Sequence, residues 1–154
     1  MHPREPRSPN STRAQRLLLV DGLQDEAAMY SEFFAHCGFR VQTCDGTEDA
    51  FTAALAEPPD IVVTRIRQST GQRDGIQLTA QLRRASQTRD VPVVIITTSI
   101  LRSDYAAARN AGCNRVVVLP VTPEELLDEI QAAISSSGRV SHPRAGRRTP
   151  REDA

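Results

Sequence analysis

The chain has 154 residues, of which 19 are arginine, 19 are aspartate or glutamate, and none is lysine. The absence of lysine excludes Schiff-base chemistry and a phosphate-binding loop that ends in a lysine. The net charge of zero argues against a simple nucleic-acid binder, and the length suits one domain that needs neither a metal ion nor a disulfide as a staple.

The charge is spread unevenly along the chain. Residues 1–16 and residues 138–154 each carry a net charge of +3, and the residues between them carry −6. Residues 1–15 and 136–154 are rich in small, polar and arginine residues and offer no apolar face that could pack. We expect both segments to be disordered basic tails that flank an acidic domain at residues 16–135.

Five short apolar runs lie between the tails. Runs of this length that are apolar on both faces are typical of buried strands in a parallel sheet. The predicted strands are Arg16–Asp21, Phe39–Cys44, Ile61–Thr64, Val91–Thr97 and Val116–Leu119.

Segments with helical periodicity alternate with these runs. The predicted helices are Asp25–Cys37, Thr47–Ala56, Ile76–Ala85, Ser103–Ala111 and Thr122–Ile134. Strands that alternate with helices predict an α/β fold with a doubly wound, five-stranded parallel sheet.

Local signals add detail to two of these helices. The first helix is predicted to place Ala28, Phe33 or Phe34, and Cys37 on one face. Thr47 is the predicted N-cap of the second helix.

A further local signal marks the start of the last helix. Thr122 and Glu125 are three residues apart, which is the spacing of a capping box, and the proline after Thr122 suits the first position of a helix. We therefore expect these two residues to cap the helix reciprocally.

In such a sheet the ligand or reactive site lies outside the carboxyl ends of the strands. Here those positions are Asp21 and Gly22, residues 64–67, residues 97–99, and Leu119 with the proline that follows it. No glycine-rich phosphate loop follows the first strand, so no nucleotide cradle is predicted. No set of serine, histidine and aspartate is positioned by the sequence, and we expect neither catalytic residues nor metal ligands.

The cysteines and the apolar runs bear on the location of the protein. Cys37, Cys44 and Cys113 show no metal-binding or redox spacing, which favours free thiols in a reducing compartment. No apolar run is long enough for a signal peptide or a membrane span. These features predict a cytoplasmic protein that does not contact a membrane.

A series of short motifs follows the order and spacing found in bacterial response-regulator receiver domains. The motifs are Leu17–Asp21, Gly38–Val41, Pro59–Val63, Asp74–Ile76, Val91–Thr97, Ala111–Cys113 and Leu119–Leu126. The chain therefore resembles this family of two-component signalling over nearly all of residues 16–135. The resemblance implies a flavodoxin-like (βα)5 sandwich whose partner is a histidine kinase or another regulator.

The resemblance also implies a phosphorylation site, of which this sequence keeps little. The family transfers a phosphoryl group to an aspartate at the end of the third strand, and needs a Mg²⁺ ion and a lysine to neutralise the developing charge. The acceptor position here is Arg65, and a guanidinium cannot accept a phosphoryl group. The acidic pair that would hold the metal is Asp21 and Gly22, and the lysine position is Leu119.

Two further positions complete the implied site. Thr97 matches the hydroxyl residue at the end of the fourth strand, and Val116 stands where the family has a switch aromatic. One carboxylate beside a fixed cation would bind Mg²⁺ poorly, so we expect magnesium binding to be lost and no cofactor to replace it. Arg65 is predicted to pair with Asp21 and to hold the following loop in one state, the alternative being that Arg65 points to solvent.

These positions together predict a pseudo-receiver that is not an enzyme and acts through protein–protein interaction without phosphorylation. Two alternatives stay open. The basic tails could bind nucleic acid or an acidic partner non-specifically, with the receiver fold as a scaffold. The chain could also be a conventional phosphorylated receiver whose acceptor is not recognised.

The last two predicted helices and their flanks carry opposite charges. The basic residues are Arg102, Arg109 and Arg115, and the acidic residues are Glu124, Glu125, Asp128 and Glu129. Such a surface could bind a partner or make a two-fold homodimer self-complementary, the alternative being an ordinary solvated surface.

Overall fold

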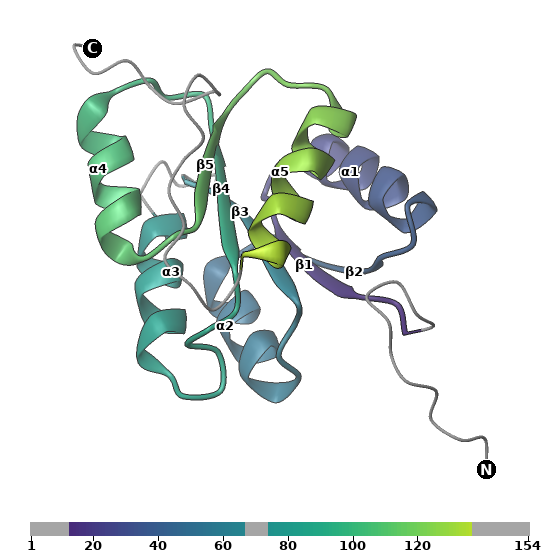
Figure 1. The fold of residues 1–154 in the computed structure, drawn as a ribbon, viewed down its shortest axis with the longest axis horizontal. Coiled ribbons are helices and arrows are strands. Elements are labelled where there is room, and N and C mark those ends of the chain that lie inside the picture. Colours follow the sequence, from purple (N-terminus) through teal and green to yellow (C-terminus); the bar gives the residue numbers. More distant parts are fainter. Residues whose placement is uncertain (1–12, 67–73, 137–154) are drawn as a thin grey trace.

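The computed structural model describes residues 13–66 and 74–136, which form one parallel five-stranded sheet with the order β2-β1-β3-β4-β5 (Figure 1). The strands are β1 (Arg16–Val20), β2 (Arg40–Cys44), β3 (Ile61–Arg65), β4 (Val93–Thr97) and β5 (Arg115–Val118). The helices are α1 (Gln24–His36), α2 (Thr47–Ala56), α3 (Asp74–Arg84), α4 (Arg102–Ala111) and α5 (Pro123–Ser135). The predicted doubly wound sheet is confirmed. The predicted tails lie outside the described residues, apart from residues 13–15 and 136.

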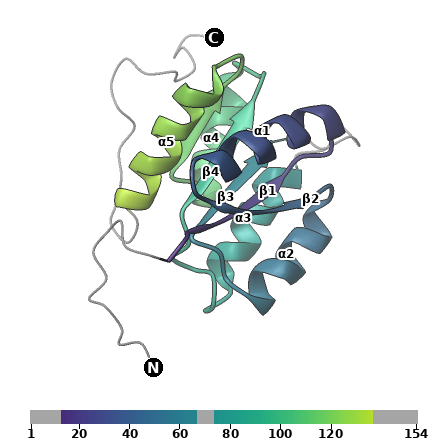
Figure 2. The same ribbon diagram turned by 90° about the vertical axis from the view of Figure 1, so that its right-hand side faces the viewer.

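Helices cover both faces of the sheet (Figures 1 and 2). Leu17 and Leu19 of β1 belong to the core under α1 and α5, whereas Leu18 and Val20 belong to the core under α2, α3 and α4. Successive strand residues point to opposite faces of a sheet, which explains why the central strands must be apolar throughout.

The buried face of α1 differs from the predicted one. Ala27, Tyr30 and Phe34 are buried, whereas Ala28 and Cys37 are exposed, so the prediction was wrong for those two residues. The rings of Tyr30 and Phe34 stack with their centroids 5.8 Å apart. These large rings set the rotation of the helix because they bury far more apolar area than alanine or cysteine can.

The helix starts also test the predicted caps. The capping box of α5 is confirmed, because Glu125 N donates to Thr122 Oγ1 at 3.0 Å and Thr122 N donates to Glu125 Oε1 at 2.9 Å. The prediction for Thr47 was wrong. Gly46 occupies the N-cap position of α2 in an extended conformation, and Thr47 is already the first helical residue, so its hydroxyl cannot reach back to cap the helix.

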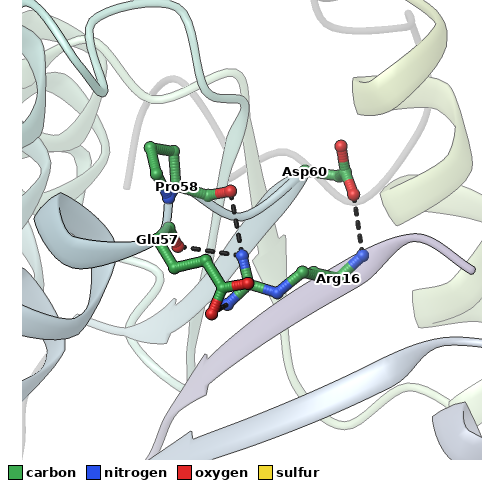
Figure 3. Close-up of polar contacts among 4 residues, drawn as sticks. All are labelled: Arg16, Glu57, Pro58 and Asp60. Atoms are coloured by element: carbon green, nitrogen blue, oxygen red, sulfur yellow. Dashed lines mark hydrogen bonds and ion pairs between the residues drawn. The ribbon is translucent and has the colours of Figure 1, made fainter.

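Arg16 ties the amino end of the sheet together (Figure 3). Its guanidinium donates to the carbonyl oxygens of Glu57 and Pro58, at 2.9 and 3.0 Å, where α2 ends. Its backbone N–H donates to Asp60 Oδ2 at 2.7 Å. A cation at a helix C-terminus is favourable, so we assign these contacts of Arg16 a stabilising role rather than a role in ligand binding. Asp60 therefore lies at the opposite end of β3 from the candidate site.

A second partly buried arginine, Arg83, links α3 to the segments that precede β4 and β5. Arg83 donates through Nε to Gly112 O at 3.0 Å, and through its terminal nitrogens to Val91 O at 2.6 Å, Arg89 O at 3.1 Å and Asn114 Oδ1 at 2.9 Å. Gly112 has φ of +106°, and a Cβ there would lie 2.9 Å from the Arg83 side chain. Arg83 thus donates to three loop carbonyl groups at once.

None of the helices in the described part of the chain is both long enough and apolar enough to span a lipid bilayer.

We expect Arg83→Met to lower the free energy of unfolding by about 2 kcal/mol or more, because four acceptors lose a charged donor in a partly buried place. Arg84→Met, at the neighbouring exposed position of the same helix, should change it by less than about 0.5 kcal/mol. Urea unfolding of the two variants measures both values, and equal losses would contradict the role of Arg83.

Candidate functional site

Three of the predicted site residues meet at the carboxyl end of the sheet. Asp21 follows β1, Arg65 is the last residue of β3, and Thr97 is the last residue of β4, and these three strands are neighbours. Arg65 Nε lies 3.5 Å from Asp21 Oδ1. The predicted contact between these two side chains is confirmed.

A second carboxylate completes the cluster. The Arg65 Nη2 atom lies 3.6 Å from Oε1 of Glu26, in the first turn of α1. Glu26 was not predicted as a site residue, although an acid in the first turn of a helix that starts just after Asp21 is a signal that could have indicated it. Arg65 therefore joins the ends of β1 and β3 to the start of α1.

The cluster is largely withdrawn from solvent. The Asp21 side chain is fully buried, and the side chains of Arg65 and Glu26 are 15% and 20% exposed. Asp21 Oδ1 also accepts the backbone N–H of Leu23 at 2.9 Å, whereas the buried Oδ2 atom has no hydrogen-bond partner among the described residues. A buried carboxylate needs its cation, because removal of one partner leaves an uncompensated charge.

The acidic groups of the cluster titrate abnormally. Burial raises the pKa of Asp21, and the Leu23 N–H and the Arg65 guanidinium oppose this only in part. The pKa of Glu26 is raised by burial and then by the charge of Asp21, with Arg65 acting in the opposite direction. Burial, followed by the charge of Glu26, also raises the pKa of Tyr30 one turn further along α1. The Arg65 guanidinium thus opposes the rise in the pKa of both carboxylates.

The start of α3 lies against the backbone of Arg65 and Ile66. Gly75 N donates to Ile66 O at 3.1 Å, and a Cβ atom at Gly75 would overlap the carbonyl oxygen of Arg65. A residue without a side chain is therefore required where α3 meets the end of β3. This contact explains the Asp-Gly sequence at the beginning of α3.

The Thr97 hydroxyl is engaged in a local turn. It accepts the backbone N–H of Ser99 at 3.0 Å, and the hydroxyl of Ser99 in turn donates to the buried Asp104 at 2.5 Å. Thr97, Thr98, Ser99 and Arg65 contribute to the lining of a small cavity of about 100 Å³. The segment between β4 and α4 is therefore held by its own hydrogen bonds.

The remaining predicted site positions supply no charge and no ring. Gly22 has no side chain, so Asp21 supplies the carboxylate that directly follows β1. Leu119 packs against the core under α1 and α5, and the peptide bond that joins it to Pro120 is cis. Val116 packs against the core on the other face of the sheet. These positions are filled by apolar packing rather than by polar chemistry.

The charged surface proposed from the sequence needs one correction. Arg115 Nη1 lies 3.5 Å from Glu129 Oε1, and both side chains are only 10% exposed. The prediction that these two residues face solvent was wrong, because β5 and α5 pack against each other and the two charges compensate within the chain.

The other members of that surface are more exposed, but several have contacts within the chain. Arg109 lies over the Tyr105 ring at 5.9 Å from its centroid and donates to its hydroxyl at 3.2 Å. The Glu125 carboxylate is used in the capping box of α5. Exposed positions are also occupied by Arg102, Glu124 and Asp128.

The residues at this end of the sheet do not suit a divalent cation. Asp21 is flanked by Gly22, and a guanidinium lies 3.5 Å from its Oδ1 atom, where a metal ion would meet a fixed positive charge. Over residues 13–66 and 74–136, no group of three or more histidine, cysteine, aspartate or glutamate side chains could hold a metal ion. The cluster has the chemistry of an ion pair rather than of a metal centre.

Comparison with protein families gives one assignment for most of the chain. A family model described as the response regulator receiver domain matches residues 17–131. Protein PilH of Pseudomonas aeruginosa is 28% identical over 120 residues, which are 78% of this chain and 98% of PilH. The phosphate regulon transcriptional regulatory protein PhoB of Escherichia coli is 29% identical over 122 residues, but the match spans only 52% of PhoB.

Solved structures show the same fold. A putative response regulator from Chloroflexus aurantiacus has a TM-score of 0.74 at 24% identity, over 80% of this chain and 99% of that one. The receiver domain of the sensor histidine kinase PA1611 from Pseudomonas aeruginosa, solved with a magnesium ion in its active-site cleft, has a TM-score of 0.73 at 24% identity, over 80% of this chain and its full length.

The raised pKa of Asp21 makes its contribution to stability depend on pH. Because the folded pKa lies above the ordinary value of 3.8, the folded state binds a proton more readily than the unfolded state. The contribution of Asp21 to the free energy of unfolding is therefore greatest in acid, and it falls as the pH rises from about 3.8 through the folded pKa. We expect wild type to lose more stability between about pH 3.8 and neutral pH than Asp21→Asn does.

Urea unfolding at both pH values measures this difference, and Asp25→Asn, at an exposed position in the first turn of α1, is the control for the loss of one carboxylate. The same pH profile for wild type and Asp21→Asn would contradict the account.

Proposed function

Because the chain belongs to the response regulator receiver domain family of two-component signalling, we propose that it is a receiver that works without phosphorylation. The observation that carries the proposal is the contact of Arg65, at the end of β3, with the buried Asp21. A permanent cation occupies the place where the family gains a negative phosphoryl group.

The chemistry of the site supports this proposal. Phosphoryl transfer to a protein needs a nucleophile and positive groups that neutralise the oxygens of the phosphoryl group. Arg65 has no nucleophilic atom at physiological pH, and Leu119 carries no charge. Asp21 is buried and already serves as the partner of Arg65.

Magnesium binding belongs to the same proposal. The PA1611 receiver domain is described with a magnesium ion in its active-site cleft. In this chain one aspartate follows β1 directly, and its nearer oxygen faces a guanidinium, so we propose that the chain no longer binds this ion.

Other aspartates are poor candidates for an acceptor. Asp60 lies at the amino end of β3, and its carboxylate accepts a hydrogen bond from the backbone N–H of Arg16. Asp104 is buried and accepts a hydrogen bond from Ser99. A conventional phosphorylated receiver is therefore less well supported than a receiver without phosphorylation.

A fixed site suggests how such a receiver would act. Arg65 holds the ends of β1 and β3 against α1, and Thr97 is held in its own turn between β4 and α4. With these segments in one state, the chain would present an unchanging surface to its partner. Receiver domains interact with histidine kinases and other regulators, and we propose a protein of this kind as the partner.

We expect acetyl phosphate with millimolar Mg²⁺ to leave the mass of wild type and of Arg65→Asp unchanged. The single substitution restores a carboxylate at the acceptor position, but Gly22 and Leu119 still leave the developing charge without metal or ammonium. Intact-mass measurement detects the phosphoryl group, and a receiver with the complete set of residues shows that the donor is active. A stable phosphorylated form of wild type or of Arg65→Asp would contradict the proposal.

A further inference from the structure

An open groove of about 440 Å³ lies beside the site, between α1, the end of β2 and the start of α2. Three carboxylates contribute to its lining, those of Asp21, Asp45 and Asp49, and Ala27 and Ala28 add an apolar part. None of the described residues that line it is basic. The Arg65 pair does not account for this second acidic surface.

Asp21 contributes an unused hydrogen-bond acceptor to the residues that line the groove. One carboxylate oxygen, Oδ1, accepts the Leu23 N–H and faces Arg65. The other, Oδ2, is buried and has no hydrogen-bond partner, while its residue lines the groove. A buried acceptor without a donor is unfavourable, so a donor that enters from the groove would relieve it.

The two outer carboxylates give the groove a negative field. Asp45 and Asp49 are exposed, and their charges add to burial in raising the pKa of Cys44, which also lines the groove. A positive ligand would be attracted there, because several carboxylates line one partly enclosed space.

The residues that line the groove favour one kind of ligand. These three side chains do not form a group that could hold a single metal ion, within the part of the chain that is described. A guanidinium presents five N–H donors in a planar fork, and its aliphatic stem packs against small apolar residues such as Ala27 and Ala28. An arginine side chain therefore fits better than a metal ion.

We propose that this groove binds an arginine side chain from the chain's own residues 138–154. This segment carries five arginines, Arg139, Arg144, Arg147, Arg148 and Arg151, beside a body of net negative charge. The 18 residues after Ser136 span up to about 60 Å when extended, more than the width of a domain whose radius of gyration is roughly 13 Å. A tethered ligand also has a local concentration of about a millimolar or more, which favours it over a free partner.

Trypsin tests this proposal in the full chain, because it cleaves after arginine. At low salt we expect cleavage after Arg144, Arg147 and Arg148 to be about threefold faster in Asp45→Asn/Asp49→Asn than in wild type, since cleavage follows the population of the undocked segment. The matched control is Glu124→Gln/Asp128→Asn on α5, which changes the net charge equally and should cleave at the wild-type rate. Equal rates in all three proteins, or equal acceleration in both variants, would overturn the proposal.

A second arm separates the groove from its occupant. The full chain with all five arginines of the segment changed to glutamine is titrated with N-acetylarginine amide, and the citrulline analogue is the neutral control. We expect the arginine probe alone to shift the amide signals of Asp45 and Asp49. No shift, or the same shift with citrulline, would overturn the groove as an arginine site. A shift by arginine alone together with unchanged trypsin rates would overturn residues 138–154 as the occupant. The inference does not depend on how the Arg65 site works.

Discussion

The guanidinium of Arg65, placed against the buried Asp21 and against Glu26, is the interaction on which the carboxyl end of the sheet depends. Two carboxylates whose pKa values are raised by burial share this cation, and its charge opposes that rise in both. The surrounding backbone is shaped to keep Arg65 there, because α3 begins with Gly75 directly against its carbonyl group. The Arg65 side chain thereby joins the ends of β1 and β3 to the first turn of α1, and its backbone lies against the start of α3.

Under the proposed function, this arrangement would replace a transient charge with a permanent one. A phosphorylated receiver changes state when a phosphoryl group arrives, and it needs mobile polar groups that respond to it. Here the responding groups have other partners or are apolar. Thr97 is held by Ser99, and Leu119 packs into the core. At the other end of the sheet, Arg16 and Arg83 make separate hydrogen bonds to loop carbonyl groups. These contacts stabilise the fold independently of Arg65.

Some of this could be predicted from the sequence, and the reasons differ from one feature to the next. Parallel strands end at the same edge of a sheet, which was enough to bring Arg65 to Asp21, and the capping box of α5 is a local pattern. Glu26 was not predicted because its contact with Arg65 depends on where α1 begins and on the rotation of that helix. The buried rings of Tyr30 and Phe34 set this rotation. The contact of Arg115 with Glu129 depends on tertiary packing of β5 against α5, and no local pattern encodes it.

The central claim is that Arg65 and Asp21 act as one unit, and a double-mutant cycle measures this most directly. The cycle compares the free energies of unfolding of wild type, Arg65→Met, Asp21→Asn and the double variant at neutral pH. We predict a coupling free energy of about 2 kcal/mol, because Arg65→Met leaves the buried Asp21 without its cation, whereas Asp21→Asn leaves Arg65 with Glu26. Additive effects, with a coupling below about 0.5 kcal/mol, would contradict the account.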